Sequence, residues 1–413
     1  MTAPIRPTPS TGDRSALPLA APLRPARDPG HRVTTRFADP AERERVLAWL
    51  DAGLRPGRPG RLVREYPLLF APDSRAVPIT VWSGARPVSF CLLWPTSFRL
   101  RDARLRTGLI SLVYTDPDER GRGLARKALD AAQREARARD LGLCLLWSEL
   151  ADFYAAQGFT RAGSESLLGL DADVIARLRR ASPPGVAEPL RVERATTADW
   201  KAIAELRALR RCHVDLAEAG AALAGIPDLD VRVVRGGRGL VAFAMCGRGD
   251  DFGGVVHEWG GDPEGVLRCC AALVAEAGPG NGLLLLAPDE RSEVAWRLRE
   301  AGAPRVRNPL AWFALTSLPV LAADLAGLAP GFARSLRLEP AAGSEAAEGS
   351  LVLVDRRSGE ARSLEAAELM ALLFSKPSDP AAAAIRARIA DLVPTPVLDE
   401  LPLPLFVWGL ESI

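Results

Sequence analysis

One stretch of the chain, residues 107–163, constrains the fold more than any other. The apolar run Leu109–Thr115 predicts a strand, and residues 120–123 then read Arg-Gly-Arg-Gly. An amphipathic helix is expected from about Arg122 to Arg139. The glycines permit positive φ and close approach of a ligand, and a helix start offers unpaired N–H groups at the positive end of its dipole. Strand, loop and helix together predict a cradle for a pyrophosphate.

The spacing in this loop separates it from two common phosphate loops. The loop lacks the Gly-Lys-Ser/Thr of a P-loop, and Arg126 stands where the dinucleotide motif has its third Gly. What remains is Arg120-x-x-Gly123-x-Ala125 between a strand and a helix. An expected buried strand at 141–147 follows, and then Phe-Tyr-Ala-Ala-Gln-Gly-Phe at 153–159. Either motif alone is usually a surface turn or a helix end. It is their order and separation along the chain that indicate a functional site.

The two motifs resemble those of the GNAT superfamily of acyl-CoA-dependent N-acetyltransferases, which read Arg/Gln-x-x-Gly-x-Gly/Ala and Phe/Leu-Tyr-x-x-x-Gly-Phe. The resemblance implies that the strand ending at Thr115 splays from the next one and binds the pantetheine arm through its backbone. It assigns cofactor binding to these residues: Val113, Tyr114, Thr115, Arg120, Gly121, Arg122, Gly123, Leu124, Ala125 and Arg126. The family's Asn seven residues before the Tyr is Trp147 here, which puts side-chain contacts from that strand end in doubt.

Tyr154 is the expected catalytic acid for the leaving thiolate. A phenol with a pKa of about 10 is protonated at neutral pH and can give its proton to a thiolate whose pKa is about 8.5. The alternative is a tyrosine that only fills the helix–sheet core. The general base stays open between the terminal carboxylate of Ile413, which the resemblance suggests, Glu149 and water. Glu149 and Asp152 both precede Tyr154 but are expected on other faces of its helix.

The same order of elements occurs twice, which predicts tandem GNAT folds with a smaller C-terminal domain, an α+β (mixed α/β) architecture. This arrangement resembles the enhanced intracellular survival-type acetyltransferases, whose last domain is similar to sterol carrier domains. The expected divisions are a disordered leader at 1–35, a catalytic GNAT domain at 36–180, a degenerate GNAT-like domain at 190–322 and an α+β domain at 325–413. The apolar run 401–410 is expected to dock.

The second copy lacks the cradle. His257-Glu258-Trp259-Gly260-Gly261-Asp262-Pro263 stands at the corresponding place, and its acids would repel a pyrophosphate. One acyl-CoA site per chain is therefore expected. His257 and Glu258 lack the second His of a zinc protease, so a structural role is favoured over a role in a substrate pocket. Asp250, Asp251 and Glu258 are interpreted as solvated loop charges, with recognition of a cationic amine as the alternative.

Composition bounds the remaining classes of function. A formal net charge of +2 argues against a nucleic-acid-binding surface. No apolar stretch is long enough to cross a membrane, so no membrane partner is expected. Six cysteines without metal-ligand spacing predict buried free thiols, no metal and a reducing, cytoplasmic compartment. A homo-oligomer is compatible with the sequence.

The sequence thus predicts an N-acetyltransferase that moves an acetyl group from acetyl-CoA, its cosubstrate, to a primary amine of a small molecule, peptide or protein. The alternative is a non-catalytic acyl-CoA-binding regulatory or scaffold protein. The acceptor and the acyl-chain preference carry no readable code in the sequence.

Overall fold

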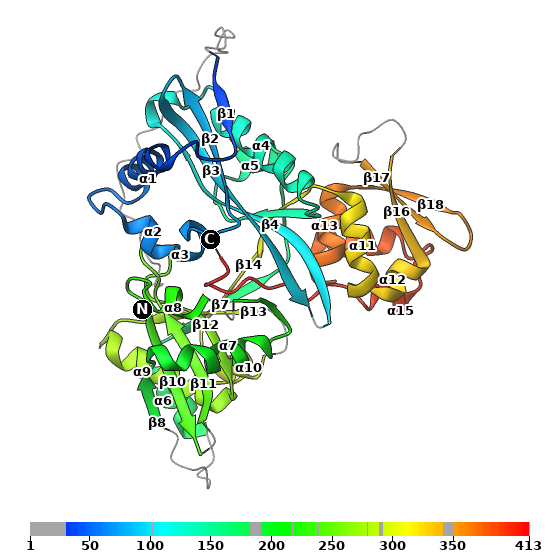
Figure 1. Cartoon of the computed structure of the whole chain (residues 1–413). Helices are drawn as coiled ribbons and strands as arrows, with labels where there is room; N and C mark the ends of the chain where they lie inside the picture. Colours follow the sequence, from blue (N-terminus) through cyan, green and yellow to red (C-terminus); the bar gives the residue numbers. More distant parts are fainter. Residues whose placement is uncertain are drawn as a thin grey trace, which may run out of the picture.

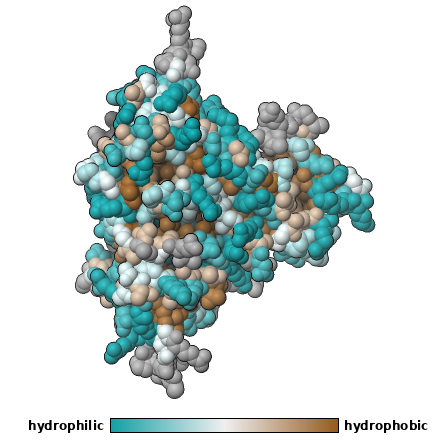
Figure 2. All heavy atoms as spheres, in the orientation of Figure 1, coloured by the Kyte–Doolittle hydropathy of each residue, from teal (hydrophilic) through white to brown (hydrophobic). Residues whose placement is uncertain are grey.

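The computed structural model describes residues 30–100, 102–181, 191–216, 219–237, 239–278, 280–288, 292–341 and 350–412. These residues form three β-sheets with helices packed on them, and each sheet belongs to a separate unit (Figure 1). The mixed α/β class expected from the sequence is confirmed. Figure 2 shows hydrophobic side chains gathered at the surface where the first and second units meet, on an otherwise largely hydrophilic face.

The first unit contains the strand–loop–helix stretch singled out in the sequence. Its elements are β1 (Arg32–Thr34), α1 (Pro40–Leu54), α2 (Arg61–Glu65), α3 (Pro67–Phe70), β2 (Val77–Ser83), β3 (Arg86–Leu100), β4 (Ala103–Thr115), α4 (Leu124–Ala138), β5 (Leu143–Leu146), α5 (Ala151–Ala155) and β6 (Thr160–Ala162). Asp39 caps α1 by accepting from the Glu42 backbone N–H at 2.7 Å. Helix α4 buries its apolar face, which includes Leu124, Ala128 and Leu129, against the sheet.

The second unit repeats this order. Its elements are α6 (Ala172–Ala181), β8 (Arg191–Arg194), α7 (Trp200–Ala208), β9 (Cys212–Val214), α8 (Gly220–Ala224), β10 (Asp230–Gly236), β11 (Gly239–Cys246), β12 (Val255–Gly261), α9 (Pro263–Ala277), β13 (Leu283–Pro288), α10 (Glu293–Glu300) and β14 (Arg305–Asn308). Strand β9 leaves the second unit and pairs with the far end of β3.

Strands cross between the two units in both directions. The first sheet has the order β1-β2-β3-β4-β5-β15-β6 and the second has β8-β10-β11-β12-β13-β7-β14. Strand β7 (Glu165–Leu170) follows the first unit in the chain yet lies in the second sheet, and β15 (Ala311–Leu315) follows the second unit yet lies in the first. The second domain expected at 190–322 includes the residues of β15, yet this strand pairs within the first sheet. All five residues of β15 are buried, which suits an inner strand between β5 and β6.

The third unit is a small sheet covered by helices. It comprises α11 (Leu318–Leu328), α12 (Pro330–Ser335), β16 (Leu336–Pro340), β17 (Ser350–Asp355), β18 (Ala361–Glu365), α13 (Ala366–Phe374), α14 (Pro380–Arg388) and α15 (Thr395–Leu398). Residues 401–412, here called the tail, leave this unit and run to the place where the other two units meet (Figure 1). Leu401, Phe406 and Trp408 are buried, so the prediction of a docked tail is confirmed.

Most of the expected leader, residues 1–29, lies outside the described residues. The remaining part is not irregular throughout, because Arg32–Thr34 form β1 and pair with β2. All six cysteines are free, and all except the half-buried Cys246 are buried, as the sequence predicted. Among the described residues, no helix is both long and apolar enough to span a bilayer.

The strand exchange predicts that the first two units unfold together. Phe313 of β15 is fully buried and stacks on Phe374, with ring centroids 4.8 Å apart. Phe313→Ala should lower the free energy of unfolding by about 3–5 kcal/mol, in one denaturant transition reported identically by circular dichroism and by tryptophan fluorescence. Val306→Ala on β14, a side chain that is 58% exposed, should cost less than about 0.5 kcal/mol. Two transitions, only one of which moves in Phe313→Ala, would contradict the coupling.

Candidate functional site

Strands β4 and β5 diverge partway along the first sheet. They are paired in parallel only from Thr107–Leu143 to Leu109–Leu145, while β4 continues to Thr115. Within this unpaired stretch the register against β3 shifts, and Leu112 takes a φ of 50°. A positive φ is strained for leucine, and such strain and bulges concentrate at functional sites. The expected splay therefore exists, and it leaves a free backbone edge at Ile110–Thr115.

The loop at 120–126, here called the cradle, closes one end of this parted edge. Gly121 and Gly123 have φ of 76° and 72°, and a Cβ built on either would meet nothing within 4 Å. Within the described residues, the backbone N–H groups from 121 to 126 donate to no acceptor, and the first backbone hydrogen bond after the loop is Lys127 to Gly123. A row of unpaired N–H groups at the start of a 15-residue helix is an anion-binding arrangement.

The arginines of the cradle are exposed and partly paired. Arg120 Nε lies 3.4 Å from the Thr115 carbonyl, and Arg122 Nη1 lies 2.7 Å from Glu119 Oε2. Arg126 Nε donates to Gln157 Oε1 at 3.0 Å, which ties the cradle to the Gly-Phe motif after α5. Glu119 is buried and is also bound by Arg86. The arginines thus add positive charge around the row of N–H groups while the acid holds the loop in place.

Tyr154 lies in the helix–sheet core with its hydroxyl directed to the segment after β5. The residue is 4% exposed, and its ring packs edge-on against Phe153 and Phe159. Burial raises the pKa of Tyr154, and a hydrogen bond with the Ser148 side chain opposes that rise. The phenol is therefore protonated at neutral pH, as an acid for a thiolate requires. Both roles weighed for Tyr154, core packing and proton donation, fit this position.

The candidates for the general base differ in their surroundings. Both acids are exposed, Glu149 just before α5 and Asp152 in its first turn. Ile413 lies outside the described residues, but its neighbour Ser412 is placed, and the Ser412 carbonyl accepts a hydrogen bond from buried Arg248. Arg248 also lies over the Tyr66 ring at 4.7 Å, so the last described residue of the tail reaches the contact between the first and second units.

A buried ion cluster fixes the tail there. Glu411 is fully buried and accepts from Arg207 at 3.0 Å and from the Val214 backbone N–H at 2.8 Å. Glu258 is also fully buried and accepts from Arg207 at 3.2 Å and Arg210 at 2.7 Å. The arginines hold the pKa of Glu258 at about 2 against its burial, whereas burial raises the pKa of Glu411 to about 7.

The acids of the second copy have structural partners. Glu258 belongs to the ion cluster, so its interpretation as a solvated loop charge is wrong. Asp251 binds Arg55 at 2.8 Å and also the Tyr66 hydroxyl, and Asp250 binds Arg58, so these two acids join the second unit to α1–α3. His257 is fully buried, and burial lowers its pKa to about 4; the structural role favoured for it is confirmed. The sequence analysis did not identify Glu411 as a member of a site. An acid at the end of so apolar a run could have indicated a buried partner.

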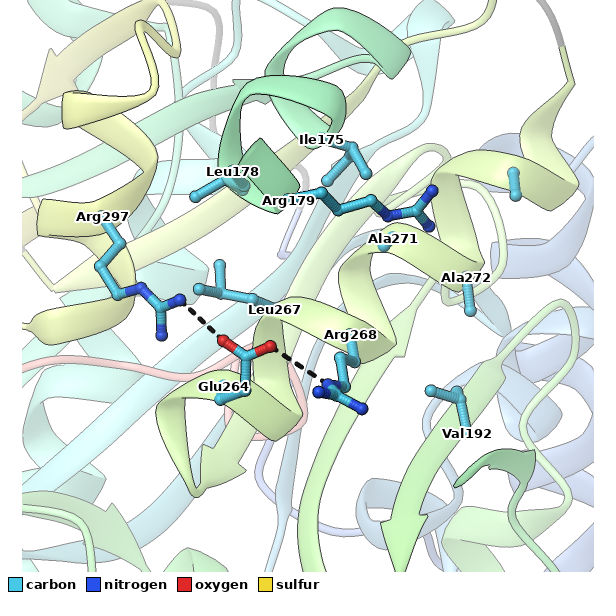
Figure 3. Close-up of a pocket in the computed structure, with 11 residues that line it drawn as sticks. Ile175, Leu178, Arg179, Val192, Glu264, Leu267, Arg268, Ala271, Ala272 and Arg297 are labelled. Carbon is cyan, nitrogen blue, oxygen red and sulfur yellow. Dashed lines mark hydrogen bonds and ion pairs between the residues drawn. The ribbon is translucent and has the colours of Figure 1, made fainter. Parts of the chain in front are cut away.

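A cavity of about 530 Å³ lies away from the cradle, between α6, α9 and α10 (Figure 3). Glu264 lies between Arg268 and Arg297 and accepts from them at 3.1 Å and 2.7 Å. Its floor is formed by small and apolar side chains such as Leu267 and Ala271. Glu264 thus pairs with two of the arginines that line this cavity. Among the described residues that line it, there is no counterpart of the free strand edge or of the row of unpaired N–H groups in the first unit.

Comparison with known proteins agrees with the geometry of the first unit. Residues 79–161 match the family model of the acetyltransferase (GNAT) domain, and this stretch runs from β2 into β6 and includes the cradle and Tyr154. A search of curated proteins gave no match.

Several solved structures share the fold of nearly the whole chain. A GCN5-related N-acetyltransferase from Anabaena variabilis has a TM-score of 0.60 at 13% identity, covering 92% of this chain and 98% of that one. A GCN5-related N-acetyltransferase from Kribbella flavida has a TM-score of 0.56 at 17% identity, covering 90% and 96%. Eis1 from Mycobacterium abscessus has a TM-score of 0.51 at 14% identity, covering 86% and 96%. At such identities the likeness is one of fold.

The first unit has the GNAT fold, and the parted edge of β4 together with the cradle is called the first cleft below. Residues 79–161 belong to the GNAT superfamily, and the chain as a whole has the expected tandem GNAT architecture with a smaller third unit. The recognition made from the two sequence motifs is confirmed.

The raised pKa of Glu411 predicts how stability depends on pH. Because about 7 lies above the ordinary value of 4.5, the folded protein keeps this proton while the unfolded chain loses it. The contribution of Glu411 is fully present below about pH 4.5 and is lost as the pH rises through about 7. Glu411→Gln keeps an oxygen for the Val214 N–H and cannot ionise. It should reduce the fall in unfolding free energy between about pH 5 and pH 8 by about 1–3 kcal/mol in urea titrations.

Glu149→Gln is the matched control, because it replaces an exposed acid that is not a member of the ion cluster. It should leave the pH dependence of the unfolding free energy as in the wild type. If Glu411→Gln shows the wild-type pH dependence of the unfolding free energy as well, then Glu411 does not keep its proton in the folded protein.

Proposed function

We propose that this protein is an N-acetyltransferase that uses acetyl-CoA as cosubstrate and acetylates a primary amine of a small molecule, peptide or protein, in the cytoplasm. One observation carries the proposal: the unpaired N–H groups of the cradle stand at the end of a strand edge that has parted from its neighbour. An extended pantetheine arm needs such an edge, and a pyrophosphate needs such a loop.

The residues of the first cleft fit the cofactor in three parts. The N–H groups of Gly121 to Arg126 would bind the pyrophosphate, with Arg120 and Arg122 adding charge. The backbone of Val113, Tyr114 and Thr115 would pair with the pantetheine arm. The strained turn at Leu112 redirects the backbone at that point, so that a peptide N–H can polarise the thioester carbonyl.

The chemistry then requires one proton to leave the amine and one to reach the thiolate. The cleft would hold the thioester and the amine close together, which lowers the entropic part of the reaction barrier. Attack by the neutral amine forms the C–N bond and breaks the C–S bond, and we assign the proton for the departing thiolate to Tyr154. Its protonated phenol beside Ser148 supports this role. Glu149, water or the terminal carboxylate of Ile413 would take the amine proton.

The first test concerns the cofactor. Replacing both Arg120 and Arg122 by alanine should weaken acetyl-CoA binding at least about tenfold in calorimetry, because two charge-assisted contacts to the phosphates are lost. The matched control is Arg134→Ala/Arg137→Ala, which removes two exposed arginines from the far part of α4 and should change the Kd by less than about twofold. Equal affinity in all three proteins would mean that the cofactor lies elsewhere.

The second test separates binding from chemistry. Tyr154→Phe removes only the hydroxyl and keeps the ring that packs on Phe153 and Phe159. Turnover with an accepted amine should fall by about 100-fold, because the thiolate must leave without its acid. The Kd for acetyl-CoA and the melting temperature should stay at the wild-type values. Undiminished kcat would remove Tyr154 from the mechanism. Tight acetyl-CoA binding by the wild type without turnover on a broad amine panel would favour the non-catalytic, acyl-CoA-binding alternative.

A further inference from the structure

The second unit has a cleft at the place that corresponds to the cofactor cleft of the first. Strands β12 and β13 are paired only at Val255–Leu284 and Val256–Leu285 and then diverge, as β4 and β5 do. A cavity of about 500 Å³ lies at the diverging ends, lined by Trp259 and Gly260 of β12 and Pro288 of β13. We call this cavity the second cleft. Its size suits a small organic molecule.

The second cleft is not built for a pyrophosphate. The Asp262 carboxylate accepts from the Gly265 N–H at 2.8 Å and so occupies the start of α9 with the protein's own anion. Pro263, the next residue, has no N–H to offer. The tail also takes part of the space, because the Gly409 N–H donates to the His257 carbonyl at 3.1 Å. What remains of the cleft needs a ligand other than an acyl-CoA.

The lining is aromatic and is built from three parts of the chain. Trp259 comes from β12, Phe374 from the third unit, and Phe406 and Trp408 from the tail. Trp259 and Trp408 meet edge-to-face with centroids 5.1 Å apart. Leu209, at the end of α7, lines the same cavity and is 80% exposed. Leu209 and the aromatic rings together give this cavity the apolar lining that is common in small-molecule sites.

More cations than acids line the second cleft. Among the described residues that line it, Arg210, Arg211 and Lys376 are cations and Asp262 is the acid, already engaged in capping α9. Arg210 lies over the Trp408 ring at 3.7 Å and is held by Glu258, so a guanidinium and an aromatic ring form one continuous wall. An anionic group would be attracted to this rim, and a ring would stack below it.

We propose that the second cleft binds a small organic anion with an aromatic ring system, at a site separate from the acyl-CoA cleft. The tail supplies a wall of this site and also carries Glu411, whose partners lie in the second unit. A bound ligand therefore holds the tail in its docked position. This inference does not depend on acetyl transfer, since it rests on the second unit and the tail.

The test uses anilinonaphthalene sulfonate, an aromatic anion whose fluorescence reports binding, with the full chain. Binding should saturate at one molecule per chain and be at least about fivefold weaker in Leu209→Glu, because an acid then stands at the mouth of the cleft. Leu209→Lys should bind the probe as tightly as the wild type or more tightly. Neutral phenylnaphthylamine, which has the same rings without the sulfonate, should bind more weakly than the anion. Both substitutions fall on an exposed side chain, so folding should be unaffected.

Leu150→Glu is the matched control, since Leu150 is 63% exposed and lies next to α5 at the first cleft. It should leave probe binding unchanged, and hydrogen exchange of residues 403–410 should slow when the probe is bound. The proposal is overturned if the probe shows no saturable binding, if Leu209→Glu has no effect, or if Leu150→Glu weakens binding as much. It is equally overturned if the neutral probe binds as tightly as the anion, or if exchange in the tail is unchanged.

Discussion

A strand edge that loses its partner in the middle of a sheet must find other hydrogen bonds, and this constraint shapes both halves of the molecule. The first sheet parts after Leu109 and the second after Val256. In the second unit the protein itself fills the opening: the Trp259 indole N–H reaches the Leu286 carbonyl at 2.9 Å, and the tail donates to His257. In the first unit the edge leads into a loop of unpaired N–H groups and positive-φ glycines. The two units thus share a fold but differ at the parted edge, which the protein itself fills in the second unit.

The exchanged strands and the tail explain why the units hold their positions. Because β7 completes the second sheet and β15 the first, neither sheet is whole without the other unit. The tail then crosses between them and ends in a buried cluster of two glutamic acid side chains and two arginines. A buried ion pair is costly to break by removing one partner, so such a cluster gives the tail one defined position rather than a large gain in stability.

Local patterns predicted much of the fold and the candidate site, whereas long-range partners could not be predicted. The cradle depends on residues within one strand–loop–helix stretch, so Gly121, Gly123 and the helix start could be placed from the sequence alone. The apolar run at 311–315 fits an inner strand of either sheet, and nothing local reveals that it crosses to the first. The burial of Glu411 depends on Arg207 and Val214, about two hundred residues earlier in the chain. The sequence favoured a structural role for His257, but the partners of Glu258 became visible only in the fold.

The most direct test of one cofactor cleft in two similar folds is hydrogen exchange of the full chain with and without acetyl-CoA. Bound cofactor should slow exchange at residues 110–126, the parted edge of β4 and the cradle, and leave residues 256–265 of the second unit unchanged. Slowed exchange at 256–265, or none at 110–126, would contradict the assignment of the acyl-CoA site to the first unit.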